Sequence, residues 1–403
     1  MIKNTIYIFA GRATNAIFLF LLTLVVSRQL GPALFGVFSF LTAVIVSANC
    51  FSNLGLDTWM VREVTKTPAQ GKKYLSNIIG LKFATSVFTI ALIFVIFSAT
   101  NLPQTTLNLL WVFSISLIFN TISQTLWHYG NCFKEFIYHS VLWAASNIIK
   151  AGFGIAMVLF FHELDFLIWG IVVAEAMATI LSFYVIHHRY GPFVPKFQFT
   201  LWKDFLVRSS QIALGMIFSV LYFRLDIVML QLMTEEKIVG FYSAAYKLFE
   251  VAVVLPHSFM LVLFPKLVEE FHSDQSQFKS RFRKALVVYS LIGGVITLAL
   301  WGFSHGIISF IYGDQFLPSI KVLDILSWAI LLFFINFLFS SILIASGRES
   351  VNTWGLVGAT VLNIILNLAL IPLYGAIGAG WATLFCEIGL LVALSLQIQK
   401  SFE

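Results

Sequence analysis

Charged residues are scarce in this sequence of 403 residues. Asp, Glu, Lys and Arg together make up 11% of the chain, whereas soluble domains carry about 25%. Hydrophobic residues make up 59% of the chain, and the mean hydropathy is +0.91. This balance excludes an ordinary water-soluble globular domain, and we expect an all-α polytopic membrane protein.

Cysteines and enzyme motifs are also few. The three cysteines, Cys50, Cys132 and Cys386, are scattered and form no metal or disulfide pattern. The sequence contains no P-loop, no HExxH and no GxSxG, and we give no metal role to the adjacent His187 and His188. We therefore expect no enzyme and no cofactor. Any energy for activity would come from an ion gradient, the membrane potential or the substrate's own gradient.

The sequence is rich in long apolar runs. Each of twelve runs has about twenty residues, which is enough to cross a hydrocarbon core of roughly 30 Å. The first run lacks a small-residue cleavage site, so we interpret it as a retained helix and not a signal peptide. The predicted spans are 5–27, 36–54, 76–99, 105–128, 137–161, 166–187, 206–232, 239–264, 285–311, 319–345, 352–373 and 375–399.

Lys and Arg in the connections predict the orientation. With the N-terminus in the cytoplasm, seventeen of them lie on the cytoplasmic side and three on the other side, which is a strong positive-inside bias. We therefore expect a cytoplasmic (inner) membrane protein with both termini in the cytoplasm. Topology also explains the net charge of +6, so no nucleic-acid partner is needed. Two basic connections, 188–205 and 265–284, are predicted to lie on the surface of the membrane, against anionic lipid.

A weak internal repeat divides the chain. Residues 35–39 (FGVFS) resemble residues 239–243 (VGFYS), and Glu175 and Glu387 occupy similar places in the sixth and twelfth spans. Six spans in each half predict parallel repeats related by an axis along the membrane normal. We expect an N-terminal lobe of six helices over 1–190 and a C-terminal lobe of six helices over 191–403, around a central cationic cavity.

Nine charged residues lie at least six residues from either end of a predicted span. Such charges are costly in lipid, and they persist mainly where they meet a partner or a watery cavity. The five cations outnumber the four acids by one, so we expect one or two cations to remain free for an anionic ligand. The cations are Arg12, Lys82, Lys150, Arg224 and Lys247, and the acids are Glu175, Asp226, Glu250 and Glu387.

The positions of these charges suggest different roles. Arg12 and Lys82 lie near span ends and can also be explained by snorkelling to the headgroups, whereas Lys150 lies deeper. Arg224 and Asp226 are two residues apart, so on a helix they point to different faces and each needs its own partner.

Three of the acids allow more than one interpretation. Lys247 and Glu250 are three residues apart and can neutralise each other. Glu175 and Glu387 can act as proton-linked acids, as hydrogen-bond partners between helices or as counter-ions of the buried cations. We favour the last two roles and keep both residues as candidates for ion coupling.

Loose motifs recur along nearly the whole chain. They are SRQLGP at 27–32 with FGVFS at 35–39, NLGLD at 53–57 with VRE at 61–63, RLD at 224–226, VGFY at 239–242 with AYK at 245–247, IYG at 311–313 with Phe316, ASG at 345–347, NIILN at 363–367 with Ile371 and Pro372, and YGAIGAG at 374–380. In this order and spacing, they resemble the Wzx-type polysaccharide flippases of the multidrug/oligosaccharidyl-lipid/polysaccharide exporter superfamily.

The resemblance implies twelve helices in two lobes and an alternating-access flippase. Its substrate would be a polyprenyl-diphosphate-linked oligosaccharide, moved to the outer leaflet for O-antigen, capsule or exopolysaccharide synthesis. Membrane lipids, Na⁺ or H⁺ as the coupling ion, and polysaccharide polymerase and chain-length machinery are the implied partners. Arg224, Asp226 and Lys247 match family-typical positions, whereas Arg12, Lys82 and Lys150 are assigned to substrate binding by depth alone.

Other functions remain open at this point. A cation or drug antiporter of the same superfamily would need a mainly acidic cavity, whereas the charges here lean cationic. Lipid II flippases typically have helices beyond twelve. A polymerase or glycosyltransferase in the membrane would usually show a large loop with clustered acids or His, and the longest connection here has only about twenty residues.

Overall fold

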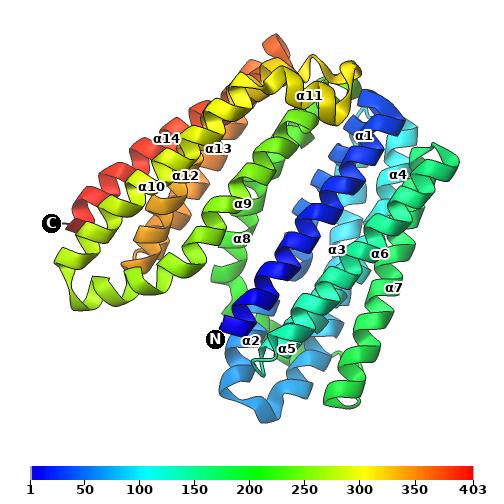
Figure 1. The fold of residues 1–403 in the computed structure, drawn as a ribbon. Coiled ribbons are helices and arrows are strands. Elements are labelled where there is room, and N and C mark those ends of the chain that lie inside the picture. The colour runs from blue at the N-terminus through cyan, green and yellow to red at the C-terminus, as the bar shows by residue number, and fades with distance from the viewer. Residues whose placement is uncertain (1, 403) are drawn as a thin grey trace. The chain divides into compact units, whose positions relative to one another are not determined.

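The computed structural model describes the backbone from residue 2 to residue 402 and the side chains of residue 11, residue 14 and residues 17–398. The described backbone consists of helices and short connections, with no strand (Figure 1). The α-helices are α1 (Ile2–Asn53), α2 (Leu56–Lys66), α3 (Gly71–Ser98), α4 (Gln104–Ser114), α5 (Ser116–Asn131), α6 (Phe136–Phe161), α7 (Leu164–Tyr190), α8 (Phe199–Met233), α9 (Glu236–Ser273), α10 (Gln275–Gly302), α11 (Ser304–Tyr312), α12 (Ser319–Ala345), α13 (Glu349–Tyr374) and α14 (Ala376–Phe402). Pro68–Gln70 and Asp314–Phe316 are 3₁₀ turns.

Eleven helical segments among the described residues are long and apolar enough to cross a membrane, so the prediction of a polytopic all-α membrane protein is confirmed. The first segment, Ile17–Lys66, includes part of the predicted span 5–27 and all of the predicted span 36–54. They lie on either side of Gly31, whose φ of 76° and ψ of 177° are not helical. A straight helix of 52 residues would be about 78 Å long at 1.5 Å per residue, far more than one crossing needs. A total of twelve spans therefore stays a prediction.

Two other predicted spans are interrupted. The span predicted at 105–128 forms α4 and α5, which are separated at Ile115. The span predicted at 285–311 ends as α10 at Gly302, and α11 follows as a separate short helix. The connection predicted at 265–284 is itself helical, because α9 continues to Ser273 and α10 begins at Gln275.

The chain forms two compact units by its own contacts. The first unit comprises residues 1–31 and 40–220, and the second comprises residues 32–39 and 221–403. The middle of α1 thus belongs with the second unit, and α8 begins in the first unit and ends in the second. The predicted lobe boundary at residue 190 stays a prediction.

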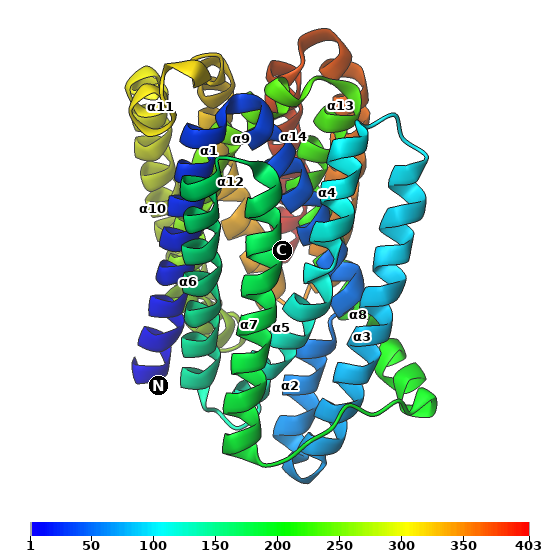
Figure 2. The same ribbon diagram turned by 90° about the vertical axis from the view of Figure 1, so that its right-hand side faces the viewer.

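In the first unit, α6 and α7 lie side by side (Figure 2). The connection after α7 is tied to α3, because the backbone N–H of Lys196 donates to the carbonyl of Ser76 at 2.9 Å. The connection passes so close to Gly80 that a Cβ added there would lie 2.2 Å from the carbonyl oxygen of Lys196. The first turns of α8 then bury Trp202 and Phe205 against α2 and α3.

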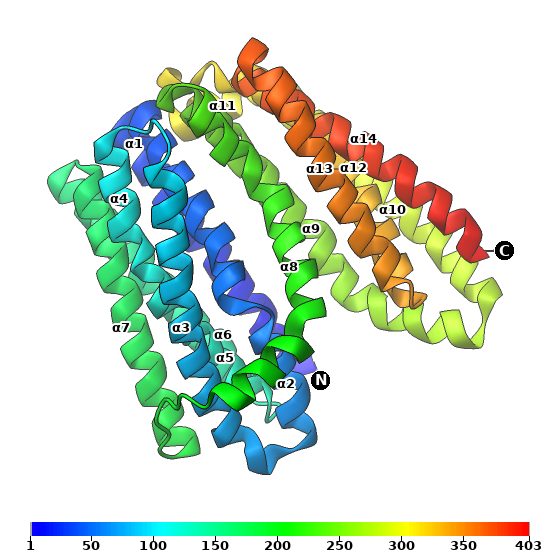
Figure 3. The ribbon, with the colours of Figure 1, turned by 180° about the vertical axis from the view of Figure 1, so that it is seen from behind.

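In the second unit, α12 packs against α9, α10 and α14, and α13 packs against α14 (Figures 1 and 3). The short stretch 32–39 crosses the start of α9 at two glycines. A Cβ on Gly36 would lie 1.9 Å from the carbonyl oxygen of Glu236, and a Cβ on Gly240 would lie 1.9 Å from that of Pro32. The two segments that resemble each other in sequence are therefore packed directly against each other.

Candidate functional site

Two cations share one carboxylate between α8 and α9. Arg224 of α8 forms an ion pair with Glu250 of α9, and the Lys247 ammonium lies 2.6 Å from the other carboxylate oxygen of Glu250. All three side chains are 19–20% exposed, so they are partly accessible. Lys247 and Glu250, which their spacing allows to neutralise each other, do form an ion pair, and their role in substrate binding stays a prediction. The cluster carries one net positive charge within helices that qualify as membrane spans.

Asp226 lies two residues from Arg224 but in a separate, buried cluster. Its Oδ1 accepts hydrogen bonds from the side-chain amides of Asn363 at 2.7 Å and Asn367 at 2.6 Å. Its Oδ2 accepts from Tyr242 at 2.7 Å and Thr383 at 2.9 Å. Four neutral donors from α9, α13 and α14 thus surround the carboxylate, and none of the described ion pairs includes it.

Glu387 of α14 is also held by neutral donors. Tyr222 donates to its Oε1 at 2.7 Å, and the Asn336 side-chain amide donates to its Oε2 at 2.7 Å. The carboxylate is fully buried and links α8, α12 and α14. This geometry favours a hydrogen-bond link between helices over a counter-ion of a cation.

Lys82 of α3 is completely buried and forms an ion pair with Asp57 of α2 at 2.7 Å. Asp57 also accepts hydrogen bonds from Asn53 at 2.8 Å and from Thr125 at 2.9 Å. The lysine therefore does not snorkel to an interface. This placement favours a structural role, and its assignment to substrate binding stays a prediction.

Lys150 of α6 forms an ion pair with Glu175 of α7. The Asn120 side-chain amide donates to the same Glu175 oxygen at 3.1 Å, and the other oxygen, Oε2, has no hydrogen-bond partner among the described residues. Glu175 thus has the counter-ion role that we favoured. The Arg12 side chain lies outside the described residues, so its predicted role is not examined by the structure.

A pocket of about 420 Å³ in the first unit combines aromatic and amide side chains. It is lined by Gln124, Trp127, His128, Asn131, Phe136, His139 and Trp143. The Asn131 amide lies 3.4 Å from His128 Nδ1 and 3.2 Å from His139 Nδ1. Gln124 accepts a hydrogen bond from Asn53 at 3.2 Å, so the pocket connects with the Asp57–Lys82 pair.

The charge balance predicted from the sequence missed some of the partners. Asp57 lies beyond the predicted end of its span at residue 54, so it was not counted among the acids. The asparagines that bind Asp226 are more than 130 residues away in the sequence, and the asparagine that binds Glu387 is 51 residues away, so no local pattern connects them. One signal was present: Asn363 and Asn367 are four residues apart in an apolar run, so they share a face of a helix.

Hard cations prefer carboxylate, amide and hydroxyl oxygens, whereas the neighbours of Asp226 and Glu387 direct N–H and O–H donors at these carboxylates. Among the described residues, no group of three or more His, Cys, Asp or Glu side chains gathers as a metal site. The Asp226 cluster remains as a candidate for an ion, because it combines one carboxylate with the neutral oxygens of its amide and hydroxyl neighbours.

Comparison with known proteins places the chain in a family. A family model described as "Polysaccharide biosynthesis protein" matches residues 1–271. The capsular polysaccharide biosynthesis protein CapF of Staphylococcus aureus is 20% identical over 387 residues, which cover 94% of each chain. The probable low-salt glycan biosynthesis flippase Agl15 of Haloferax volcanii is 23% identical over 163 residues, which cover 40% of this chain and 34% of that protein.

Solved structures share the fold. The inward closed conformation of the lipid II flippase MurJ superposes with a TM-score of 0.79 at 17% identity, covering 100% of this chain and 89% of that one. An inward-facing multidrug resistance transporter of the MATE family superposes with a TM-score of 0.73 at 13% identity, covering 96% and 95%. At such low identity these structures show the transporter fold alone.

Proposed function

Because the chain belongs to the polysaccharide biosynthesis protein family, we propose that it is a flippase for a lipid-linked oligosaccharide. The substrate is a polyprenyl-diphosphate-linked oligosaccharide, moved by alternating access from the cytoplasmic to the outer leaflet of the cytoplasmic membrane. The resemblance noted in the sequence, the relatives and the transporter fold support this proposal. The observation that carries it is the pair of cations, Arg224 and Lys247, on the single carboxylate of Glu250.

The Glu250 cluster suits a diphosphate that must bind and then leave. Arg can meet phosphate oxygens through two parallel N–H bonds, and Lys meets them as a point charge. Without substrate, Glu250 neutralises part of their charge and limits the cost of two cations in a low dielectric. With substrate, the diphosphate competes with Glu250 for the same donors. This exchange of partners keeps net binding weak enough for release.

The pocket lined by Trp127 and Trp143 is suited to a sugar. Sugars present hydroxyl groups around apolar ring faces, and aromatic rings with nearby amide groups complement both. Trp143, His139 and Gln124 are partly exposed in this pocket. The proposal assigns the diphosphate to the Glu250 cluster and a sugar unit to this pocket.

Ion coupling would act through buried carboxylates. The Asp226 cluster supplies oxygen ligands for Na⁺ if its amides turn their oxygens inward, and Glu387 supplies a second buried acid for H⁺. Glu175 retains one unpaired buried oxygen. We assign the coupling ion to these carboxylates and expect an imposed Na⁺ or H⁺ gradient to change the transport rate.

Flipping in proteoliposomes tests the proposal directly. The purified chain is reconstituted with a polyprenyl-diphosphate oligosaccharide from the source organism, and a probe detects the sugar only on the outside. We expect the sugar to become accessible only when the protein is present. If no sugar moves while a cationic dye is extruded against a gradient, the antiporter function replaces this one.

Neutralising Arg224 tests the assignment of the Glu250 cluster. In Arg224→Gln, Lys247 still neutralises Glu250, so we expect a folded protein with a transport rate at least tenfold lower. Lys321→Gln, at an exposed site far along the chain, serves as the control and should transport normally. Full transport by both Arg224→Gln and Arg224→Gln/Lys247→Gln would contradict the cluster assignment but not the family.

A further inference from the structure

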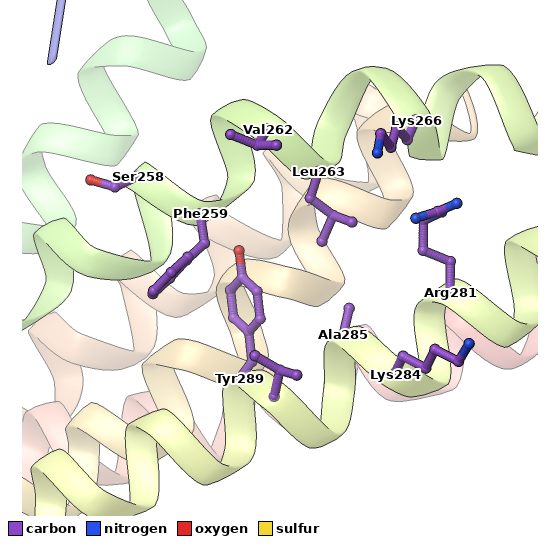
Figure 4. A pocket seen from close by; sticks show the side chains of 10 residues that line it. Ser258, Phe259, Val262, Leu263, Lys266, Arg281, Lys284, Ala285 and Tyr289 are labelled. Atoms are coloured by element: carbon purple, nitrogen blue, oxygen red, sulfur yellow. The ribbon is translucent and has the colours of Figure 1, made fainter. Parts of the chain in front are cut away.

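A groove of about 480 Å³ runs between α9 and α10 in the second unit. Figure 4 shows that its cations, Lys266, Arg281 and Lys284, gather at one end, and that Phe259 and Tyr289 lie toward the other. Small-molecule sites commonly have volumes of about 300–1,000 Å³. The groove is therefore large enough for part of an amphiphilic molecule.

The cationic end carries excess positive charge. None of the residues that line the groove is an acid. The neighbouring Glu270 is occupied by Arg281, whose Nε lies 2.7 and 2.6 Å from its two carboxylate oxygens. Lys266 and Lys284 are exposed, and no ion pair involving them occurs among the described residues. The three cations outnumber the one neighbouring carboxylate, Glu270, so the end of the groove carries a net positive charge.

The rest of the groove is apolar and accessible. Phe259, Val262 and Val288 are 45%, 68% and 47% exposed, and both helices qualify as membrane spans. The Tyr289 hydroxyl donates to the Pro256 carbonyl at 3.0 Å, so it offers no free donor to a ligand. A ligand would therefore meet positive charge at one end and hydrocarbon along the remainder.

We propose that this groove binds one anionic phospholipid, with its phosphate between Lys266 and Lys284 and an acyl chain along Phe259, Val262 and Val288. The charge pattern matches a single headgroup on a hydrocarbon tail. Lysines that only set the orientation of the protein need to lie on the cytoplasmic side of the membrane. Such lysines need no groove beside them and no apolar wall that continues from them. The proposed site is distinct from the Glu250 cluster and does not depend on the transport function.

Native mass spectrometry of the purified full chain tests the site. Detergent micelles are doped with equal amounts of phosphatidylglycerol and phosphatidylcholine, and the retained lipid is counted. We expect selective retention of phosphatidylglycerol. Lys266→Gln/Lys284→Gln should weaken its apparent affinity about 25-fold, since each lysine contributes about fivefold toward an anionic lipid.

Two further variants distinguish binding in the groove from a general attraction of anionic lipid to surface lysines. Lys73→Gln/Lys203→Gln removes two exposed lysines from the same predicted side of the membrane and should retain phosphatidylglycerol normally. Val288→Trp keeps every cation but fills the apolar wall, and it should lower retention. Because Val288 is exposed, this variant is expected to fold, and its unfolding temperature checks that.

Three results would overturn the proposal. They are unchanged retention in Lys266→Gln/Lys284→Gln, equal losses in both lysine pairs, and equal retention of the two lipids by the native chain. Displacement of phosphatidylglycerol by farnesyl diphosphate at lower concentration would instead assign the groove to a prenyl diphosphate.

Discussion

The charged residues inside the helices are distributed unequally among their partners. Lys82 and Lys150 each have one acid within the first unit, whereas Arg224 and Lys247 share Glu250 in the second. Asp226 and Glu387 are bound by neutral donors. Among the described residues, the excess of positive charge therefore lies on the two cations that share Glu250. The count of five cations and four acids in the predicted spans does not reveal this position.

The buried pair of Lys82 and Asp57 should be structural. Lys82→Met leaves the Asp57 charge buried, which typically costs about 3–5 kcal/mol, so we expect a clear fall in unfolding temperature. Lys82→Met/Asp57→Asn removes both charges and should lose less than the sum of the single variants. Thermal unfolding in detergent measures both effects. An unchanged unfolding temperature in Lys82→Met would show that the pair does not stabilise the fold.

Glu135, in the connection between α5 and α6, should make stability depend on pH. Hydrogen bonds from Arg189 and Tyr190 lower the pKa of the Glu135 carboxyl. Because the pKa is lower in the folded state, the ionised carboxyl stabilises the folded protein when the pH is above the unfolded-state pKa of about 4.3. This stabilisation is lost as the pH falls through the folded-state pKa.

Comparison of Glu135→Gln with the native chain tests this effect. The native chain should be the more stable at pH 7, and the difference should shrink as the pH falls below the unfolded-state pKa of about 4.3 and through the lower folded-state pKa. Because Arg189 is half exposed, added salt should also reduce the difference. If the stability difference between the native chain and Glu135→Gln grew as the pH fell, the folded-state pKa of Glu135 would be raised and not lowered.

At the scale of single elements, the spans were predictable because lipid requires about twenty apolar residues. Ten of the twelve predicted spans correspond to one unbroken helix each or to part of one. The helical continuation of α9 through Pro265 was not predictable from composition, since charge and proline both suggested a loop. Asp274 separates α9 from α10 and caps the start of α10, because its side chain accepts hydrogen bonds from the N–H groups of Ser276 and Gln277.

The partners of Asp226 mark where prediction from sequence ends. Its donors Tyr242, Asn363 and Thr383 come from three helices, and helix packing decides which faces meet. Arg224 and Asp226 could be assigned to different faces from their spacing, but Glu250 could not be assigned to Arg224. Local periodicity gives the face of a helix and does not give its neighbour.

The crossing of residues 32–39 with α9 should depend on two glycines. Gly36→Ala or Gly240→Ala would place a Cβ 1.9 Å from a carbonyl oxygen, so the backbones must separate. We expect a loss of about 1–3 kcal/mol or more, seen as a lower unfolding temperature.

Gly294 of α10 provides a matched control for these substitutions. A Cβ there meets nothing within 4 Å, so Gly294→Ala should be neutral or stabilise its helix by about 0.5–1 kcal/mol. Equal tolerance of alanine at all three positions would show that the close approach is not required.

At the scale of the whole molecule, the topology predicted from Lys and Arg can be tested with cysteines. The three native cysteines are buried, so a membrane-impermeant maleimide should react little with the native chain in intact cells. Asn101→Cys, between α3 and α4, should be labelled from outside. Gln277→Cys, near the start of α10, should be labelled only after the membrane is opened. The reverse pattern would invert the orientation and the proposed direction of transport.

The membership of residues 32–39 in the second unit has a consequence for synthesis. Gly36 leaves the ribosome about 200 residues before Gly240, its partner. At roughly 5–20 residues per second, that interval is on the order of 10–40 s. During that time the first helical segment must stay inserted with its glycine face uncovered. The second half of the chain, translated alone, would therefore lack residues 32–39 and could not complete this crossing.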